Sequence, residues 1–301
     1  MATLYTQVSR NKARSLFYLL FFALLIMAVG WFASYYFGDP TILVLAVGIA
    51  VAMSLFSYFG GDKVALATSG AKRIKKEDNP YVYNMVENLA ITAGLPMPKV
   101  YVIDDPAPNA FATGRNPQKA SVAVTTGIVK KLENEELEGV IAHELAHVGN
   151  YDIRLMMIVV VLVGIITLLA DFFLRMAFFG GGSNREGGQL RLILMIVGFV
   201  LVLLSPIFAM LIQLAISRRR EYMADATGAL LTRYPEGLAR ALEKIDRDHQ
   251  PLRSANKATA HLFIANPLKD HKKDAQSWFA GLFNTHPPIA ERVQALREMS
   301  A

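Results

Sequence analysis

Residues 140–154 read VIAHELAHVGNYDIR and place two histidines, with a glutamate beside the first, in an otherwise apolar stretch. On a helix of 3.6 residues per turn, His143 and His147 point the same way, and Glu144 lies beside them. The apolar residues at 137, 141, 145 and 148 form a stripe, and Glu144 falls against it. A carboxylate there without a partner would cost several kcal/mol or shift its pKa. The pattern therefore predicts a charged partner for this helix.

The spacing His-Glu-x-x-His supplies such a partner in the form of Zn²⁺. Two neutral imidazoles bind the ion, and Glu144 becomes the base that takes a proton from a water molecule acidified by the metal. We expect one zinc ion per chain, although imidazole and carboxylate ligands also suit other first-row metals. The alternative is a helix whose histidines only cap or pair.

A third protein ligand completes a catalytic zinc site, with a fourth position left open. No histidine follows closely, because residues 148–157 contain none. Glu221 in RRREYMADATGA is the best candidate, and Asp225 lies one helical turn later. Asp225 suits an acceptor for the free N–H of a ligand histidine. Considered without the rest of the chain, this pair is equally typical of a surface ion-pair helix.

The membrane topology favours the ligand interpretation. A helix of about 20 apolar residues crosses a bilayer core. His147 lies eight residues before the third such run and Glu221 five residues after the fourth, so an even number of crossings returns both to one face. Small Ala224 and Gly228 would let the second helix approach closely. The four predicted spans are 15–33, 41–59, 155–174 and 192–216.

Basic residues indicate the orientation of these spans. Lys and Arg gather before the first span, after the second and after the fourth, whereas the 34–40 turn has none. This pattern places the N-terminus, residues 60–154 and the C-terminal region in the cytoplasm. Arg175, Arg185 and Arg191 in the third loop favour the opposite orientation, but the inner total is larger. The net charge of +6 fits anionic lipid rather than nucleic acid, and the absence of cysteine suits a reducing compartment.

The remaining segments predict a small α+β unit. Helical spacing runs through 81–94, and β-branched residues at 99–103 and 120–125 favour strands on either side of a short extended piece at 109–113. Further helices are expected after residues 217, 234 and 287, whereas 250–276 has no clear period. We therefore expect a mainly α membrane protein with four transmembrane helices and an α+β zincin-type metalloprotease domain, with its sheet on one membrane face.

The sequence resembles the HtpX-like membrane zinc metalloproteases, which are gluzincins related to the CAAX prenyl endoprotease. Besides the two hairpins, the motifs NAFATG (109–114), HELAH (143–147), EYMADATGA (221–229) and THPPIAERV (285–293) occur in order. The resemblance implies that His143, His147 and Glu221 bind zinc, that Glu144 is the general base, and that Asp225 supports the site.

The same resemblance gives meaning to two stretches that spacing cannot interpret. It implies that Asn109, Ala110 and Phe111 form the edge strand to which an extended substrate adds. It also implies that His286, with Arg292 behind it, stabilises the oxyanion of the reaction. Taken without the family, Asn109 is a turn residue and THPPIAER a helix N-terminus.

We therefore expect a zinc-dependent endopeptidase in the bacterial inner membrane, with its active site facing the cytoplasm. Its partners would be polypeptide substrates, chiefly misfolded or damaged membrane proteins, and the bilayer, without nucleic acid and with an undetermined oligomeric state. The expected units are an N-terminal hairpin at 1–60, the first protease part at 61–154, a second hairpin at 155–217 and the second protease part at 218–301.

Two other functions fit parts of the sequence. A protease restricted to prenylated peptides would share the zinc motif, but that relative encloses its site within more spans. A channel or transporter with a structural zinc ion is the second alternative. The spans carry few internal charges, whereas translocation paths usually contain buried ionisable groups.

Overall fold

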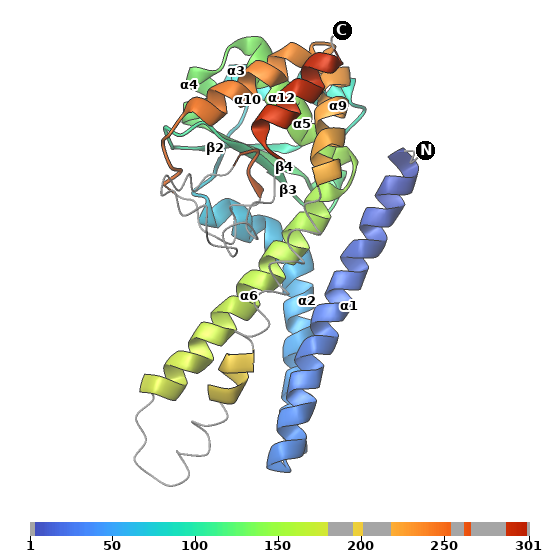
Figure 1. The fold of residues 1–301 in the computed structure, drawn as a ribbon, viewed down its shortest axis with the longest axis vertical. Coiled ribbons are helices and arrows are strands. Elements are labelled where there is room, and N and C mark those ends of the chain that lie inside the picture. Colours follow the sequence, from blue (N-terminus) through green and yellow to red (C-terminus); the bar gives the residue numbers. More distant parts are fainter. Residues whose placement is uncertain (1–3, 180–194, 201–217, 254–261, 266–286, 300–301) are drawn as a thin grey trace.

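The computed structural model describes residues 4–179, 195–200, 218–253, 262–265 and 287–299. It has two parts (Figure 1). Three long helices, α1 (Leu4–Phe37), α2 (Pro40–Thr68) and α6 (Asp152–Phe179), pack against one another and extend from a compact upper part. That upper part contains the sheet and the shorter helices, and the N-terminus of α1 reaches up beside it.

Helices α1 and α2 form the predicted N-terminal hairpin. Both are long and apolar enough to cross a membrane, over Val8–Tyr36 and Pro40–Thr68. The turn between them is built from Gly38, whose φ of 66° is accessible to glycine, and Asp39, whose carboxylate accepts a hydrogen bond from the Thr41 backbone at 2.9 Å. The apolar runs predicted at 15–33 and 41–59 lie within these helices.

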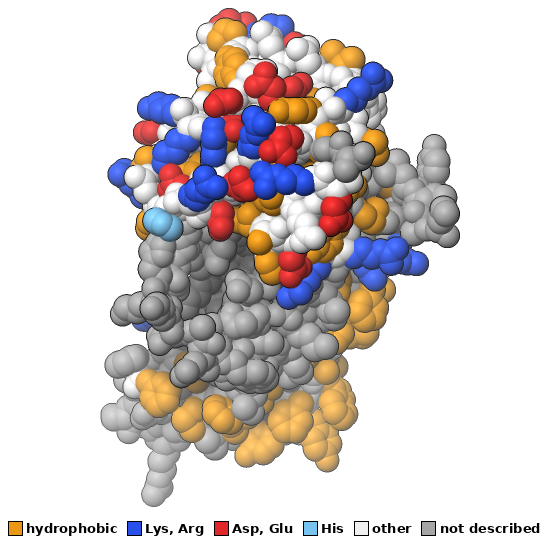
Figure 2. All heavy atoms as spheres, turned by 45° about the horizontal axis from the view of Figure 1, so that its top comes forward, with side chains coloured by type: hydrophobic (Ala, Val, Ile, Leu, Met, Phe, Trp, Pro, Cys, Tyr) orange, Lys and Arg blue, Asp and Glu red, His pale blue; other side chains and the backbone are white. Residues whose placement is uncertain are grey.

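The surface of the hairpin is apolar, and the surface of the upper part is charged. Leu24 and Val44 are 61% and 71% exposed. Figure 2 shows hydrophobic side chains gathered on the long helices and Lys, Arg, Asp and Glu gathered on the upper part. Over residues 8–36 of α1, the buried positions form a narrow stripe of Asn11, Ser15, Tyr18, Phe22, Gly30 and Ala33. The hairpin therefore exposes large apolar side chains, whose contact with water is unfavourable.

The third predicted span, 155–174, lies within α6. Helix α6 starts shortly after the preceding helix of the chain ends at Gly149. Tyr151, which lies between the two helices, has a positive φ of 60°. The fourth predicted span, 192–216, lies mostly outside the described residues, which include only the helical stretch 195–200. Its crossing remains a prediction.

A four-stranded mixed sheet lies in the upper part, in the order β1, β2, β4, β3. Strands β2 (Lys99–Ile103) and β4 (Ser121–Thr125) are parallel, and β3 (Ala110–Thr113) runs antiparallel to β4. These three were predicted. Strand β1 (Lys72–Arg73) was not, because two exposed residues carry no period. Strand β3 forms one edge of this sheet.

Helices cover both faces of the sheet. One face packs with α3 (Pro80–Thr92), α5 (Asn134–Gly149), α10 (Pro235–Arg247) and α12 (Ile289–Glu298) into the larger core. The other face packs Phe111 with Leu66 and Leu155 from the inner ends of α2 and α6. Every residue of α5 from 139 to 148 is buried. The predicted apolar stripe of this helix is buried, and from 139 to 148 the other faces of the helix are buried too.

Candidate metal centre

The site forms where α5 crosses α9 (Arg218–Thr232). The predicted close approach is present at Gly228, where an added Cβ would lie 3.0 Å from the His143 backbone nitrogen. Ala224 is fully buried in the same crossing. Because only small residues stand between the helices, side chains from both can reach a common point.

Three side chains meet at that point. Within the described part of the chain, His143, His147 and Glu221 have ligand atoms that all lie within 4.8 Å of one another. The two Nε2 atoms are 3.2 Å apart. The Glu221 carboxylate lies 3.5 Å from His147 Nε2 and 3.9 Å from His143 Nε2. Tetrahedral bonds of about 2.1 Å to zinc separate ligand atoms by about 3.4 Å, so this donor set fits one zinc ion.

His143 is oriented by an acidic residue from the facing helix α9. Its Nδ1 lies 2.9 Å from Asp225 Oδ1. Asp225 in turn accepts hydrogen bonds from Arg292 Nη2 at 2.6 Å and Arg292 Nε at 2.8 Å. Burial opposes ionisation of Asp225, but this bidentate arginine outweighs it and lowers the pKa of the carboxyl group. Asp225 therefore lies where it was expected, next to a ligand imidazole.

His147 is oriented by an acidic residue that the sequence did not single out. Its Nδ1 lies 3.1 Å from Asp152 Oδ2, at the start of α6. The left-handed Tyr151 turns the chain between α5 and α6 and carries Asp152 back beside the histidine. An acid five residues after HExxH, at the edge of an apolar run, was the available signal. Both imidazoles thus have a carboxylate at Nδ1, which leaves each Nε2 for a metal.

Glu144 is buried next to the ligands, with 2% of its surface exposed. Burial raises the pKa of Glu144 to about 7, against the lowering effects of His147 and of a hydrogen bond from the Ala112 backbone. A carboxyl group with a pKa near neutrality can both accept and return a proton.

The two imidazoles differ in the direction in which their pKa is shifted. Burial lowers the pKa of His143 despite the contact with Asp225. Burial also opposes protonation of His147, but the hydrogen bond to Asp152 and the charge of Glu221 outweigh it and raise its pKa to about 9. A dication bound to the Nε2 atoms would displace that proton, so zinc binding is expected to release protons.

The predicted substrate edge carries a segment of the chain itself. Ile264 donates its backbone N–H to the Ala110 carbonyl at 3.0 Å, and Asn109 Nδ2 donates to the Ala265 carbonyl at 3.1 Å. The rings of Phe111 and Phe263 meet edge to face with centroids 5.0 Å apart. Within the described residues, the edge of β3 thus accepts a backbone hydrogen bond from the segment 262–265. This contact could not be predicted, since residues 250–276 lack a period.

Two of the predicted site residues remain, Arg292 and His286. Arg292 is fully buried, pairs with Asp225, donates from Nη1 to the Ile264 carbonyl at 3.2 Å and lies 3.6 Å from Glu221. It thus connects the triad with the segment on β3. His286 lies outside the described residues, so its place relative to Glu144 remains a prediction.

Comparisons with known proteins agree with this arrangement. Residues 76–300 match peptidase family M48. The chain is 46% identical to "Protease HtpX homolog" of Tropheryma whipplei (strain Twist), over 98% of both chains. It is 44% identical to the protein of the same description from Caldanaerobacter subterraneus subsp. tengcongensis, over 99% of this chain and 98% of that one.

Among solved structures, the chain is similar to S. mikatae Ste24p, with a TM-score of 0.52 and 21% identity. The similarity covers 91% of this chain and 62% of the other, so it concerns the fold of a longer protein. Together with the converging His143, His147 and Glu221, the family match and the full-length relatives lead to one conclusion. The chain belongs to peptidase family M48 and is a zinc metallopeptidase related to the HtpX proteases.

Proposed function

We propose that the chain is a membrane-anchored endopeptidase that cuts polypeptides at the cytoplasmic face of a bacterial inner membrane. The observation that carries the proposal is the convergence of His143, His147 and Glu221 beside the buried Glu144, near one end of the long apolar helices. The protease would be built from residues 61–154 and 218–301, with 1–60 and 155–217 as its two membrane hairpins.

The residues divide the chemical work among them. His143, His147 and Glu221 would hold the ion, and Asp225 and Asp152 would fix the two imidazoles. Zinc, when bound, supplies Lewis-acid polarisation of the scissile carbonyl and acidifies a water molecule. Glu144 then accepts the proton of the attacking water and returns it to the leaving amine.

The substrate would bind in extended form along β3. Ala110 already accepts a backbone N–H from Ile264, which supports β-strand addition at this edge. A peptide bound at this edge would take the place of residues 262–265. Asn109, Ala110 and Phe111 would thus contact substrate.

The C-terminal residues would complete the site. Arg292, held by Asp225 and close to Glu221, is suited to position the ligands. His286, six residues earlier in the sequence, is proposed to stabilise the oxyanion, with Arg292 behind it.

The proposed substrates are misfolded or damaged membrane proteins. Leu66 of α2 and Leu155 of α6 pack on the same sheet face as Phe111, so the substrate edge lies near the proposed bilayer. Chains that leave the membrane partly unfolded would meet this edge first.

Cleavage of an unfolded protein by the detergent-purified chain, stripped and reloaded with zinc, tests the proposal. Glu144→Gln is expected to reduce the rate by about 100- to 10,000-fold while retaining zinc. Glu138→Gln, a change on the same helix but outside the site, is the matched control and is expected to cut normally. Equal cutting by Glu144→Gln and Glu138→Gln would refute the role of Glu144. Cutting of farnesylated peptides alone would narrow the substrate class to prenyl peptides.

A further inference from the structure

The N-terminal helix places a polar side chain at the metal centre. Asn11 of α1 is 3% exposed, although it lies near the start of a candidate membrane span. Its Nδ2 donates to Asp152 Oδ1 at 2.7 Å and to the Asn150 carbonyl at 3.0 Å. Both acceptors belong to the junction between α5 and α6, about 140 residues further along the chain.

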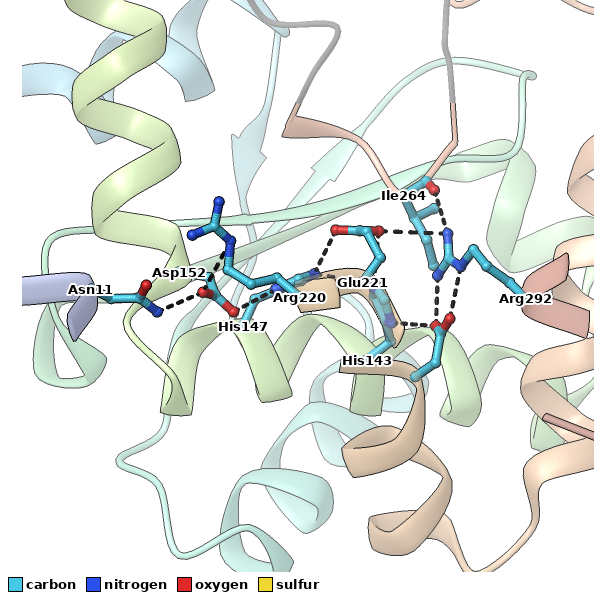
Figure 3. A network of polar contacts seen from close by, with 9 residues as sticks. Asn11, His143, His147, Asp152, Arg220, Glu221, Ile264 and Arg292 are labelled. Atoms are coloured by element: carbon cyan, nitrogen blue, oxygen red, sulfur yellow. Dashed lines mark hydrogen bonds and ion pairs between the residues drawn. The ribbon is translucent and has the colours of Figure 1, made fainter. Parts of the chain in front are cut away.

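Asp152 is the residue that orients His147. Its Oδ2 faces His147 Nδ1 at 3.1 Å while its Oδ1 accepts from Asn11, so the two oxygens of one carboxylate join α1 to a zinc ligand. Figure 3 shows this line of contacts from Asn11 through Asp152 to His147. Arg220 Nε lies 3.8 Å from the same Oδ1 and adds a charge contact from α9.

The rest of α1 explains why this contact is a constraint. Ser15, Tyr18 and Phe22 continue the buried stripe below Asn11 at helical spacing, and they fix the helix against its neighbours. The packing of this stripe holds Asn11 next to the α5–α6 junction, where the Asp152 carboxylate and the Asn150 carbonyl accept its hydrogen bonds. Without these acceptors, burial of the amide would cost about 1–3 kcal/mol. The position of Asp152 is thereby set from two sides, by its own turn at Tyr151 and by α1.

We propose that Asn11 is a positioning residue of the zinc site, through which the N-terminal membrane hairpin holds Asp152 and His147 in their metal-binding geometry. This inference rests on the proposed zinc site. Asn11 does not touch metal or substrate; it restricts the Asp152 carboxylate, which restricts the imidazole. The hairpin then contributes to zinc affinity as well as to membrane anchoring.

Zinc affinity of the full-length, detergent-purified chain, measured by competition with a chromogenic chelator, tests the proposal. Asn11→Ala is expected to weaken zinc binding by about tenfold, the lower end of the effect of partners that orient a ligand. Ser15→Ala is the matched control, because Ser15 lies one turn later on the same buried stripe and its hydroxyl donates to the Asn11 carbonyl, not to the α5–α6 junction. It is expected to change the affinity by less than about twofold.

A double-mutant cycle separates positioning from general packing. In an Asp152→Ala chain, Asn11 has lost the carboxylate it holds, so Asn11→Ala is expected to weaken zinc binding by less than about twofold further. A purely structural effect would instead give the same loss in both backgrounds. Asn11→Leu, which has a similar side-chain size and lacks the donor, covers the case in which Asn11→Ala does not fold.

The possible failures are distinguishable. A chain that binds no zinc at His143, His147 and Glu221 overturns the proposed site and this inference with it. A chain that binds one zinc ion with equal affinity in the presence and absence of the Asn11 amide overturns the inference alone.

Discussion

The α1–α2 hairpin exposes apolar side chains, whereas the crossing of α5 with α9 buries charged and polar ones. The hairpin leaves Leu24 and Val44 largely exposed, whereas the crossing buries His143, Glu144 and Asp225 almost completely. Each arrangement follows from its surroundings, because lipid stabilises exposed apolar surface and a metal ion stabilises buried polar groups. The burial of a side chain therefore has to be interpreted together with the solvent or the ligand that surrounds that part of the molecule.

The largest expected effect comes from breaking the buried ion pair of the crossing. Arg292→Ala leaves the Asp225 carboxylate buried without its bidentate partner, and we expect a loss of about 3–5 kcal/mol in stability. Arg297→Ala, on the same helix, removes exposed contacts to Glu236 and Glu243 and is expected to change stability little, because solvent screens such contacts. Denaturant unfolding followed by circular dichroism compares them. Equal small losses would show that burial of this pair is unimportant.

Exposed leucines in the two regions should respond differently to charge. Leu24→Arg places a cation on the apolar face of α1, and we expect a cost of about 2.5–3.5 kcal/mol for membrane insertion. Leu230 on α9 is 77% exposed in the charged part of the molecule, so Leu230→Arg is expected to change stability by no more than about 0.5 kcal/mol. The fraction of chain recovered in the membrane measures the first change. Normal insertion of Leu24→Arg would contradict the assignment of α1 to lipid.

Gly228 in the crossing and Gly48 in the hairpin differ in the space around them. Gly228→Ala would place a Cβ 3.0 Å from the His143 backbone, and we expect a loss of about 1–3 kcal/mol from overpacking together with weaker zinc binding. Gly48 of α2 has no atom within 4 Å of an added Cβ. Gly48→Ala should therefore be neutral or stabilise its helix by up to about 1 kcal/mol. Unchanged zinc binding in Gly228→Ala would show that the crossing distance is not critical.

The smallest expected effect concerns the edge strand that faces the long helices. Asn109→Ala removes the hydrogen bonds that the side chain makes to Ala265 and Ala110. With a peptide in the place of residues 262–265, the Asn109 amide would donate to the peptide instead of Ala265, and we expect the loss of this one hydrogen bond to lower kcat/KM by an amount equivalent to about 0.5–1.5 kcal/mol. Asn88→Ala on the exposed face of α3 is the control. Identical kinetics for both variants would remove Asn109 from the substrate site.

Much of the fold and the central part of the site could be predicted from local pattern. Apolar runs located α1 and α2, helical spacing located α3, β-branched residues located β2 and β4, and the spacing of HExxH placed His143 and His147 on one helical face. Glu221 needed one further argument, the return of the chain to the same membrane side. The structure brings these three residues together.

The residues that sequence could not reveal are those whose role depends on tertiary contacts. Asp152 has meaning only through the turn at Tyr151, and Asn11 only through the packing of α1 against the α5–α6 junction. Ile264 pairs with Ala110 through a backbone contact, which side-chain pattern does not encode. The contacts of Asn11 and of the segment at Ile264 join parts of the chain more than one hundred residues apart, and no local period records them.

The most direct test of the account is zinc binding by the chelator-stripped, full-length chain and by Glu221→Ala, with Glu236→Ala on the neighbouring α10 as control. We predict one zinc ion per chain for the unaltered protein and for Glu236→Ala. For Glu221→Ala we predict a loss of affinity greater than the roughly 10- to 100-fold typical of a hydrogen-bonding partner. Unchanged zinc affinity in Glu221→Ala would contradict the claim that α5 and α9 together form the metal centre.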